Sequence, residues 1–107
     1  MTKEEVKTKA AEIATRLGCK VIPIMVTDSE GNQIVAYFKQ PNFASIMYSQ
    51  ECILSDKDKL KGAEHLLTFI IDEESDPAYK SDDLLRASLM FAIFKAIKPY
   101  DDELKKN

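Results

Sequence analysis

The side chains that could do chemistry are few and scattered along the chain. His65 is the single histidine, and Cys19 and Cys52 are the only cysteines. No second histidine stands at a metal-ligand or catalytic spacing, so a Cys–His or Ser–His–Asp arrangement would have to be assembled by the fold around this one ring. A lone histidine on a helix is more often a surface or core residue than a catalytic one. The sequence therefore favours a protein that is not an enzyme.

The acidic residues do not follow a metal-ligand pattern either. Six of them gather in the second half of the chain: Asp72, Glu73, Glu74, Asp76, Asp82 and Asp83. Their spacing has no ligand order, so we predict no metal site and no cofactor. The segment 28–32 resembles a calcium loop only superficially, because its glycine comes too early and Lys39 stands where the last glutamate ligand is required. A metal-dependent enzyme that uses His65 and nearby acids is the less favoured alternative.

Length and charge describe an ordinary small protein. The 107 residues fit one domain, with residues 98–107 as a polar C-terminal tail, and the net charge is −3. The lysines are dispersed, which argues against a nucleic-acid partner. No run approaches the roughly 18 apolar residues of a membrane span, and the N-terminus lacks an apolar signal core. We therefore predict a cytoplasmic protein whose two cysteines are buried thiols, and the sequence does not tell whether these lie close together.

Residues 21–39 predict a β-hairpin around which the other elements are arranged. Two apolar runs flank the turn-forming segment Asp-Ser-Glu-Gly-Asn at 28–32. Pro23 cannot donate to a strand ladder, so the first strand is expected at an edge, where a further strand could add. Neither strand alternates cleanly between apolar and polar residues. Either helices cover both faces of the hairpin, or one face meets another chain.

Helical spacing predicts four helices. The first spans 3–17, with a capping box at Thr2 and a stop at Gly18, and the second spans 43–54. The third follows the polar break at 55–58 and ends near Ile71. The last begins at Pro77 or, preferably, at Ser81, and Pro99 ends it. The predicted fold class is α+β: an N-terminal helix, a two-stranded antiparallel β-hairpin, then three helices packing on it.

The apolar residues of the hairpin and of the last helix exceed what a simple core needs. From Leu89 to Phe94 the last helix is apolar all round, which is typical of a core helix. Phe38 and Phe43 are also expected in the core. Were the last helix at the surface, its apolar residues would form a patch that requires a partner. The predicted partner-binding residues come from this helix and from the face of the second strand that could be exposed: Val35, Tyr37, Met90, Phe91 and Phe94.

The segment Ile34-Val35-Ala36-Tyr37-Phe38-Lys39-Gln40-Pro41 carries a resemblance. Together with the helices after it, the acidic stretch at 82–84 and the lysine-rich C-terminus, it looks like the small tail-assembly-chaperone-like proteins of bacteriophages. The resemblance spans roughly residues 21–107 and departs from that pattern at the helix 3–17. It implies a phage protein without catalytic residues, placed in the host cytoplasm or the virion, that binds an aggregation-prone or assembling partner.

The predicted function is therefore a non-enzymatic protein-binding module, as a phage assembly chaperone or minor virion component that acts through apolar surface. Its partner would be a phage structural protein or another copy of the chain in a homo-oligomer. A small regulator or inhibitor of a host protein is the first alternative, because the sequence does not separate it from an assembly factor.

Overall fold

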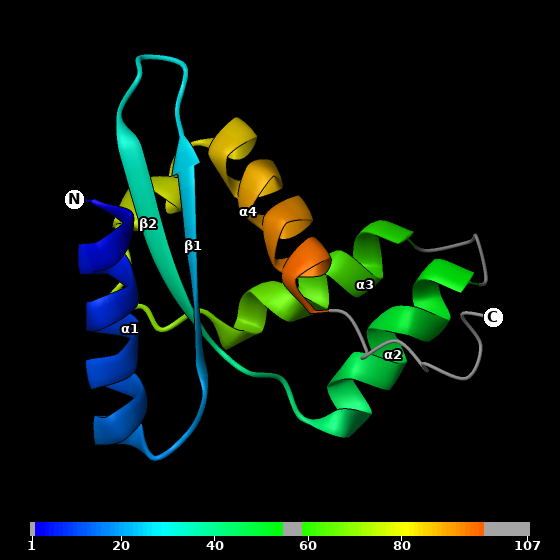
Figure 1. Cartoon of the computed structure of the whole chain (residues 1–107). Helices are drawn as coiled ribbons and strands as arrows, with labels where there is room; N and C mark the ends of the chain where they lie inside the picture. Colours follow the sequence, from blue (N-terminus) through cyan, green and yellow to red (C-terminus); the bar gives the residue numbers. More distant parts are fainter. Residues whose placement is uncertain (1, 55–58, 98–107) are drawn as a thin grey trace, which may run out of the picture.

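The computed structural model describes residues 2–54 and 59–97, and the predicted tail 98–107 lies outside this range. The elements follow the predicted α+β order (Figure 1). They are α1 (Lys3–Leu17), β1 (Val21–Thr27), β2 (Gln33–Lys39), α2 (Phe43–Leu54), α3 (Lys59–Leu66), the 3-10 turns η1 (Leu67–Phe69) and η2 (Pro77–Lys80), and α4 (Asp83–Ala96). No helix within the described residues is long and apolar enough to cross a membrane.

The hairpin forms where the turn residues predict it. β1 and β2 pair antiparallel from Val21 opposite Lys39 to Thr27 opposite Gln33. The Asp28 carboxylate accepts hydrogen bonds from the amides of Glu30 (2.9 Å) and Asn32 (2.8 Å). These bonds, led by the one from Asn32, hold the pKa of Asp28 below its usual value. Gly31 takes a left-handed φ of 86°, which other residues adopt only at a cost.

The two faces of the hairpin are covered by different helices, as Figure 1 shows with α1 on one side and α4 on the other. On the first face, Val6, Ala10 and Ile13 of α1 form a cluster with Tyr37 and Ile71. On the second face, Leu89 and Ile93 of α4 pack with residues of both strands: Ile24, Ala36 and Phe38. The hairpin is thus the middle layer, and the expectation that helices cover both faces is confirmed.

The outer edge of β2 is covered by the segment 70–76, and helical spacing assigns only the start of this segment to the third helix. The α-helix ends at Leu66 rather than near Ile71, and a 3-10 turn follows it. Ile70 then forms an isolated antiparallel bridge with Phe38, and the Ile71 amide donates to the Tyr37 carbonyl over 2.8 Å. The Ile70 amide donates to the Leu67 carbonyl over 3.1 Å and closes the 3-10 turn. Because the Ile71 amide bonds to β2, it cannot continue the helical hydrogen-bond pattern. The predicted end of the third helix is therefore wrong.

The helices at the right of Figure 1 form a pair of their own. Asn42 caps α2 as its side chain accepts from the Ser45 amide over 2.8 Å. α2 packs mainly on α3 rather than on the hairpin. The buried Ser49 hydroxyl donates to the Gly62 carbonyl over 2.9 Å, and a Cβ at Gly62 would stand 2.7 Å from the Ser49 carbonyl oxygen. The two helices therefore approach each other closely because position 62 has no side chain.

The start of α4 lies just after the preferred Ser81 and not at Pro77. Asp82 is the N-cap, and its carboxylate accepts from the Leu85 amide over 3.1 Å. Pro77 begins the separate turn η2, which Asp76 caps. The last residue of α4 is Ala96, and the predicted stop at Pro99 lies outside the described residues.

Candidate functional site

The structure divides the five predicted partner-binding residues between the two faces of the hairpin. Val35 and Tyr37 belong to the cluster under α1, whereas Met90 and Phe94 pack on the cluster under α4. Phe91 is exposed. These residues therefore do not form one continuous surface.

Tyr37 is the clearest correction among them. Its side chain was expected at the surface, but only 1 % of the residue is exposed. Helix α1 covers its ring, and the segment 70–76 bonds to its backbone on the other side. The hairpin pattern, in which Tyr37 pairs with Pro23, does not predict the burial of Tyr37. The segment that covers its backbone is more than thirty residues away in sequence. In this fold Tyr37 is not accessible to a partner.

Helix α4 presents an apolar outer surface. Leu85, Leu89 and Ile93 recur every four residues and are buried, and Leu89 and Ile93 pack in the cluster with the strands. Leu84 and Phe91 are two helical turns apart on another side of the helix, and 79 % and 57 % of them are exposed. We call Leu84 and Phe91, with the half-buried Met90 and Phe94, the α4 apolar face. The prediction that this helix is central to the core holds only for its inner side, because Leu84 and Phe91 are exposed.

A second exposed apolar pair lies on α2. Phe43 and Met47 are one turn apart, with 78 % and 51 % of each residue exposed. Phe43 was expected in the core and is not, whereas Phe38 is fully buried as expected. The difference follows from position: Phe43 is the first residue of α2, just after the Asn42 cap.

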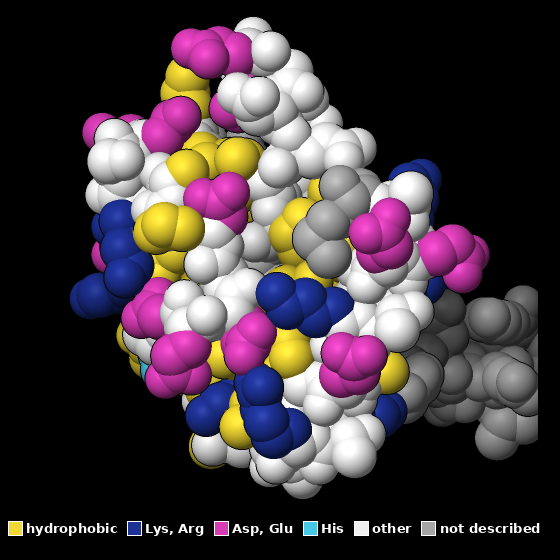
Figure 2. Space-filling view, turned by 90° about the vertical axis from the view of Figure 1, so that its left-hand side faces the viewer, with side chains coloured by type: hydrophobic (Ala, Val, Ile, Leu, Met, Phe, Trp, Pro, Cys, Tyr) yellow, Lys and Arg dark blue, Asp and Glu magenta, His cyan; other side chains and the backbone are white. Residues whose placement is uncertain are grey.

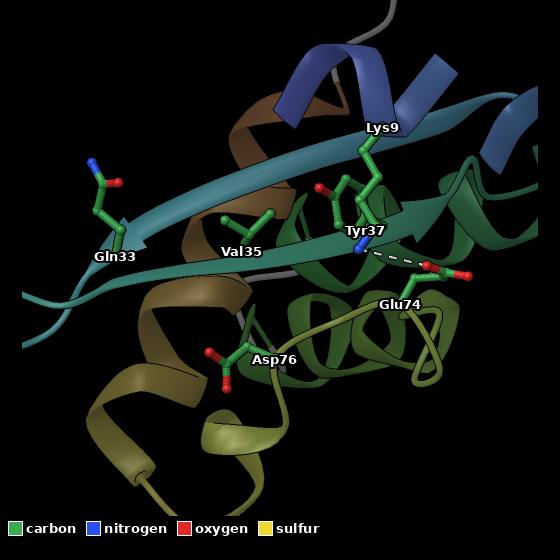
Figure 3. Close-up of a pocket in the computed structure, with 6 residues that line it drawn as sticks. All are labelled: Lys9, Gln33, Val35, Tyr37, Glu74 and Asp76. Atoms are coloured by element: carbon green, nitrogen blue, oxygen red, sulfur yellow. Dashed lines mark ion pairs between the residues drawn. The ribbon is translucent and has the colours of Figure 1, made fainter. Parts of the chain in front are cut away.

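A small polar pocket of about 190 Å³ lies beside β2, between α1 and the segment 70–76 (Figure 3). Gln33, Val35 and Tyr37 of β2 line it together with Lys9, Glu74 and Asp76. Figure 3 shows the Lys9 and Glu74 side chains meeting across the pocket. Their charged atoms are 3.7 Å apart, and Arg16 bonds to the other oxygen of the same carboxylate.

Charged side chains of α1 in this pocket attract the Glu74 carboxylate of the segment 70–76, which covers β2. The Arg16 guanidinium, and then Lys9, hold the pKa of Glu74 below its ordinary value. The Lys9 ammonium also stands 5.5 Å from the centre of the Tyr37 ring, a cation–π distance. The Tyr37 hydroxyl has no hydrogen-bond partner within the described residues, and burial raises the pKa of this phenol. The contacts of Lys9 and Arg16 with Glu74 fasten α1 to the segment 70–76 beside β2.

The predicted acidic group is distributed over separate structural roles. Burial, and then the hydrogen bond that the Tyr79 hydroxyl donates to Asp72, raise the pKa of Tyr79 to about 12. Glu74 pairs with α1, while Asp76 and Asp82 cap η2 and α4. Within the described residues, no three His, Cys, Asp or Glu side chains lie close enough together to hold a metal ion.

His65 lies in a small aromatic setting between α2 and α3. Its Nε2 atom shares a hydrogen bond of 3.1 Å with the Ser45 hydroxyl. The rings of Tyr48 and Phe69 meet it edge-on, with centroid distances of 4.9 and 6.0 Å. Neither cysteine forms a disulfide in the described structure. Cys19 is exposed rather than buried as predicted, because it follows the left-handed Gly18 that ends α1 and precedes β1.

Comparison with known proteins does not extend this description. No protein-family model, curated protein or solved structure matches the chain. The resemblance to phage tail-assembly-chaperone-like proteins therefore stays a prediction.

Proposed function

We propose that the chain is a non-enzymatic protein-binding module and that its α4 apolar face takes an apolar surface of the partner. The observation that carries this proposal is the exposure of Leu84 and Phe91, 79 % and 57 %, on one side of a single helix. Single exposed apolar residues are common on proteins. A leucine and a phenylalanine two turns apart, flanked by half-buried Met90 and Phe94, form a patch of the kind that partners cover.

Burial of Leu84 and Phe91 alone does not offset the free-energy cost of association. Full burial of a leucine or phenylalanine contributes about 1.5–3 kcal/mol each. Association costs an estimated 4–15 kcal/mol, so a stable complex needs further contacts. Half-buried Met90 and Phe94 widen the apolar centre, and the exposed Arg86 and Lys95 on the same helix supply a charged rim. Burial at the centre then provides affinity, while the rim restricts the choice of partner.

The identity of the partner rests on the sequence resemblance. It favours an assembling phage tail or virion protein, for which the chain acts as a chaperone or minor component in the host cytoplasm or the virion. A regulator or inhibitor of a host protein would use the same kind of surface. The two roles differ in the partner and not in the physical mechanism, so they are separated by a binding experiment.

The enzyme alternative has less support. His65 would have to leave its hydrogen bond with Ser45 and its edge contacts with Tyr48 and Phe69 to act on a substrate. His65→Ala tests it directly, since the protein-binding proposal predicts that partner binding survives this substitution.

The proposal is tested by light scattering with a purified phage tail subunit that aggregates when diluted from denaturant. The chain is expected to suppress scattering near equimolar amounts. The double variant Leu84→Ser/Phe91→Ser is expected to need at least about tenfold more protein, because two apolar anchors are lost. Both positions are exposed, so the fold should be kept.

Leu60→Ser is the matched control, because Leu60 is 66 % exposed but lies on α3. It should suppress scattering like the parent chain. Equal suppression by the double variant and the control would contradict the α4 apolar face as the binding surface. No suppression by the parent chain, with binding to a host protein that the double variant loses, would favour the regulator instead.

A further inference from the structure

The two strands of the hairpin differ at their outer edges. The Asp28 amide donates to the Asn32 carbonyl, and the Gln40 amide donates to the Lys20 carbonyl, at the two ends of the ladder. The backbone N–H and C=O groups of the even-numbered residues of β1 therefore point toward β2, and those of the odd-numbered residues point away from it. On β2 the outward groups bond to the segment 70–76. On β1 the outward residues run from Val21 to Thr27, and none of their backbone groups has a hydrogen bond within the described residues. β1 is thus an open edge.

A groove of about 370 Å³ follows the first half of this edge. Ala10, Ala11 and Ala14 of α1 form one wall, and residues 21–23 of β1 form the other. Small alanine side chains leave room that larger residues would fill. The strand itself is also less covered than its partner, since only Ile24 of β1 is buried, against four residues of β2. An extended segment laid along β1 would therefore find both backbone partners and apolar walls.

The charges at the groove indicate the kind of segment that fits. Lys7 and Lys20 line it, and neither forms an ion pair within the described residues. The opposite end of β1 leads into Asp28 and Glu30, and Figure 2 shows acidic side chains at the hairpin tip, at the top of the view. A segment with carboxylates beside the two lysines is complementary to this distribution.

We propose that β1 binds an extended segment of a partner protein by strand addition, with alternate apolar side chains in the alanine-lined groove and carboxylates beside Lys7 and Lys20. The amides of Val21 and Met25 donate to the added segment, and the carbonyls of Val21 and Pro23 accept from it. Pro23 has no N–H, so the ladder has a gap there that discourages uncontrolled strand addition. The site is separate from the α4 apolar face and does not depend on the function proposed above.

The probe is a synthetic, fluorescently labelled octapeptide that alternates threonine and valine and ends in two glutamates. Fluorescence anisotropy is expected to show saturable binding at or below about millimolar concentration. Lys7→Glu/Lys20→Glu should weaken binding about tenfold, and a peptide ending in two lysines should then bind this variant better than the parent chain. Ala11→Leu, an exposed substitution that fills the groove, should abolish binding.

The controls separate strand addition from other causes. Lys3→Glu/Lys39→Glu changes the net charge equally at exposed positions outside the groove and should leave binding unchanged, as should Leu84→Ser/Phe91→Ser. A peptide N-methylated at every second residue should bind at least about tenfold more weakly, because it lacks ladder donors.

No binding at millimolar peptide, equal weakening by both lysine pairs, or no effect of N-methylation would overturn the proposal. So would sedimentation of the chain as a dimer that Ala11→Leu dissociates, which would identify a second copy as the occupant.

Discussion

Helices α1 and α4 each cover one face of the same hairpin, yet their outer surfaces differ. Each buries three residues at helical spacing: Val6, Ala10 and Ile13 in α1, and Leu85, Leu89 and Ile93 in α4. The outer side of α1 is mostly lysine, glutamate and threonine, with Arg16 and Lys9 paired to Glu74. The outer side of α4 exposes Leu84 and Phe91. Helix α1 shows that a helix covering one face of this hairpin can have a polar outer side. The apolar outer side of α4 is therefore not required by the fold.

The largest expected effect tests whether the inner sides of the two helices are equivalent. Leu89→Ala and Ile13→Ala should each lower the free energy of unfolding by about 2–5 kcal/mol, because each leaves a cavity in a closed cluster. Urea unfolding followed by circular dichroism measures both. A loss below 1 kcal/mol for Ile13→Ala alone would break the comparison, since α1 would then be only loosely attached.

Removal of the caps should have a smaller effect, again similar in the two helices. Thr2 accepts from the Glu5 amide over 3.1 Å and Asp82 from the Leu85 amide over 3.1 Å. Thr2→Ala and Asp82→Ala should each cost about 0.5–2 kcal/mol of unfolding free energy. The same urea titration measures it, with Lys3→Ala as a neighbouring control. A loss confined to one helix would mean that the other end frays in the parent chain.

The two faces should also respond differently to acid. The pKa of Glu74 is lowered in the folded state, so the ion pairs of α1 stabilise the fold above the ordinary carboxyl range, and this stability is lost as the pH falls through the folded pKa. Glu74→Gln should therefore lower the melting temperature near pH 7 and converge with the parent chain as the pH falls to about 3. Salt should reduce the difference near neutral pH. A constant difference across this range would exclude the pair with Arg16 as its cause.

Much of this architecture is readable from sequence because it is local. The Thr2 and Asn42 caps, the left-handed Gly18 and the hairpin turn each depend on residues within four or five positions of one another. The remaining features depend on distant residues. The bridge between Ile70 and Phe38 overrides the helical spacing of 67–71, and the same segment buries Tyr37. Helical spacing cannot reveal either, because it contains no information about which segment reaches the β2 edge.

The candidate site was only partly predictable for the same reason. The composition of the last helix signalled surplus apolar surface, and Phe91 is indeed exposed. The sequence could not tell which side of an all-apolar helix faces the sheet, since that depends on the Asp82 cap and on the packing of Leu89 and Ile93. Leu84, the most exposed residue of the face, was therefore missed.

The smallest expected effect on stability is at the outer side of α4. Leu84→Ser/Phe91→Ser should change the unfolding free energy by no more than about 0.5 kcal/mol per site, because both residues are largely exposed. Urea unfolding of this variant, beside Leu60→Ser, measures it. A loss comparable to that of Leu89→Ala would mean that the face serves the fold, and the reason to propose a partner would disappear.

The most direct test of the account compares crosslinking from the two helices. A photoreactive phenylalanine analogue is placed either at Phe91 on α4 or at the exposed Glu12 on α1, and each chain is irradiated with the purified phage tail subunit. The account predicts a one-to-one adduct from position 91 that Leu84→Ser reduces, and little or none from position 12. Equal yields from the two positions, or none from position 91 while the chain suppresses aggregation, would contradict it.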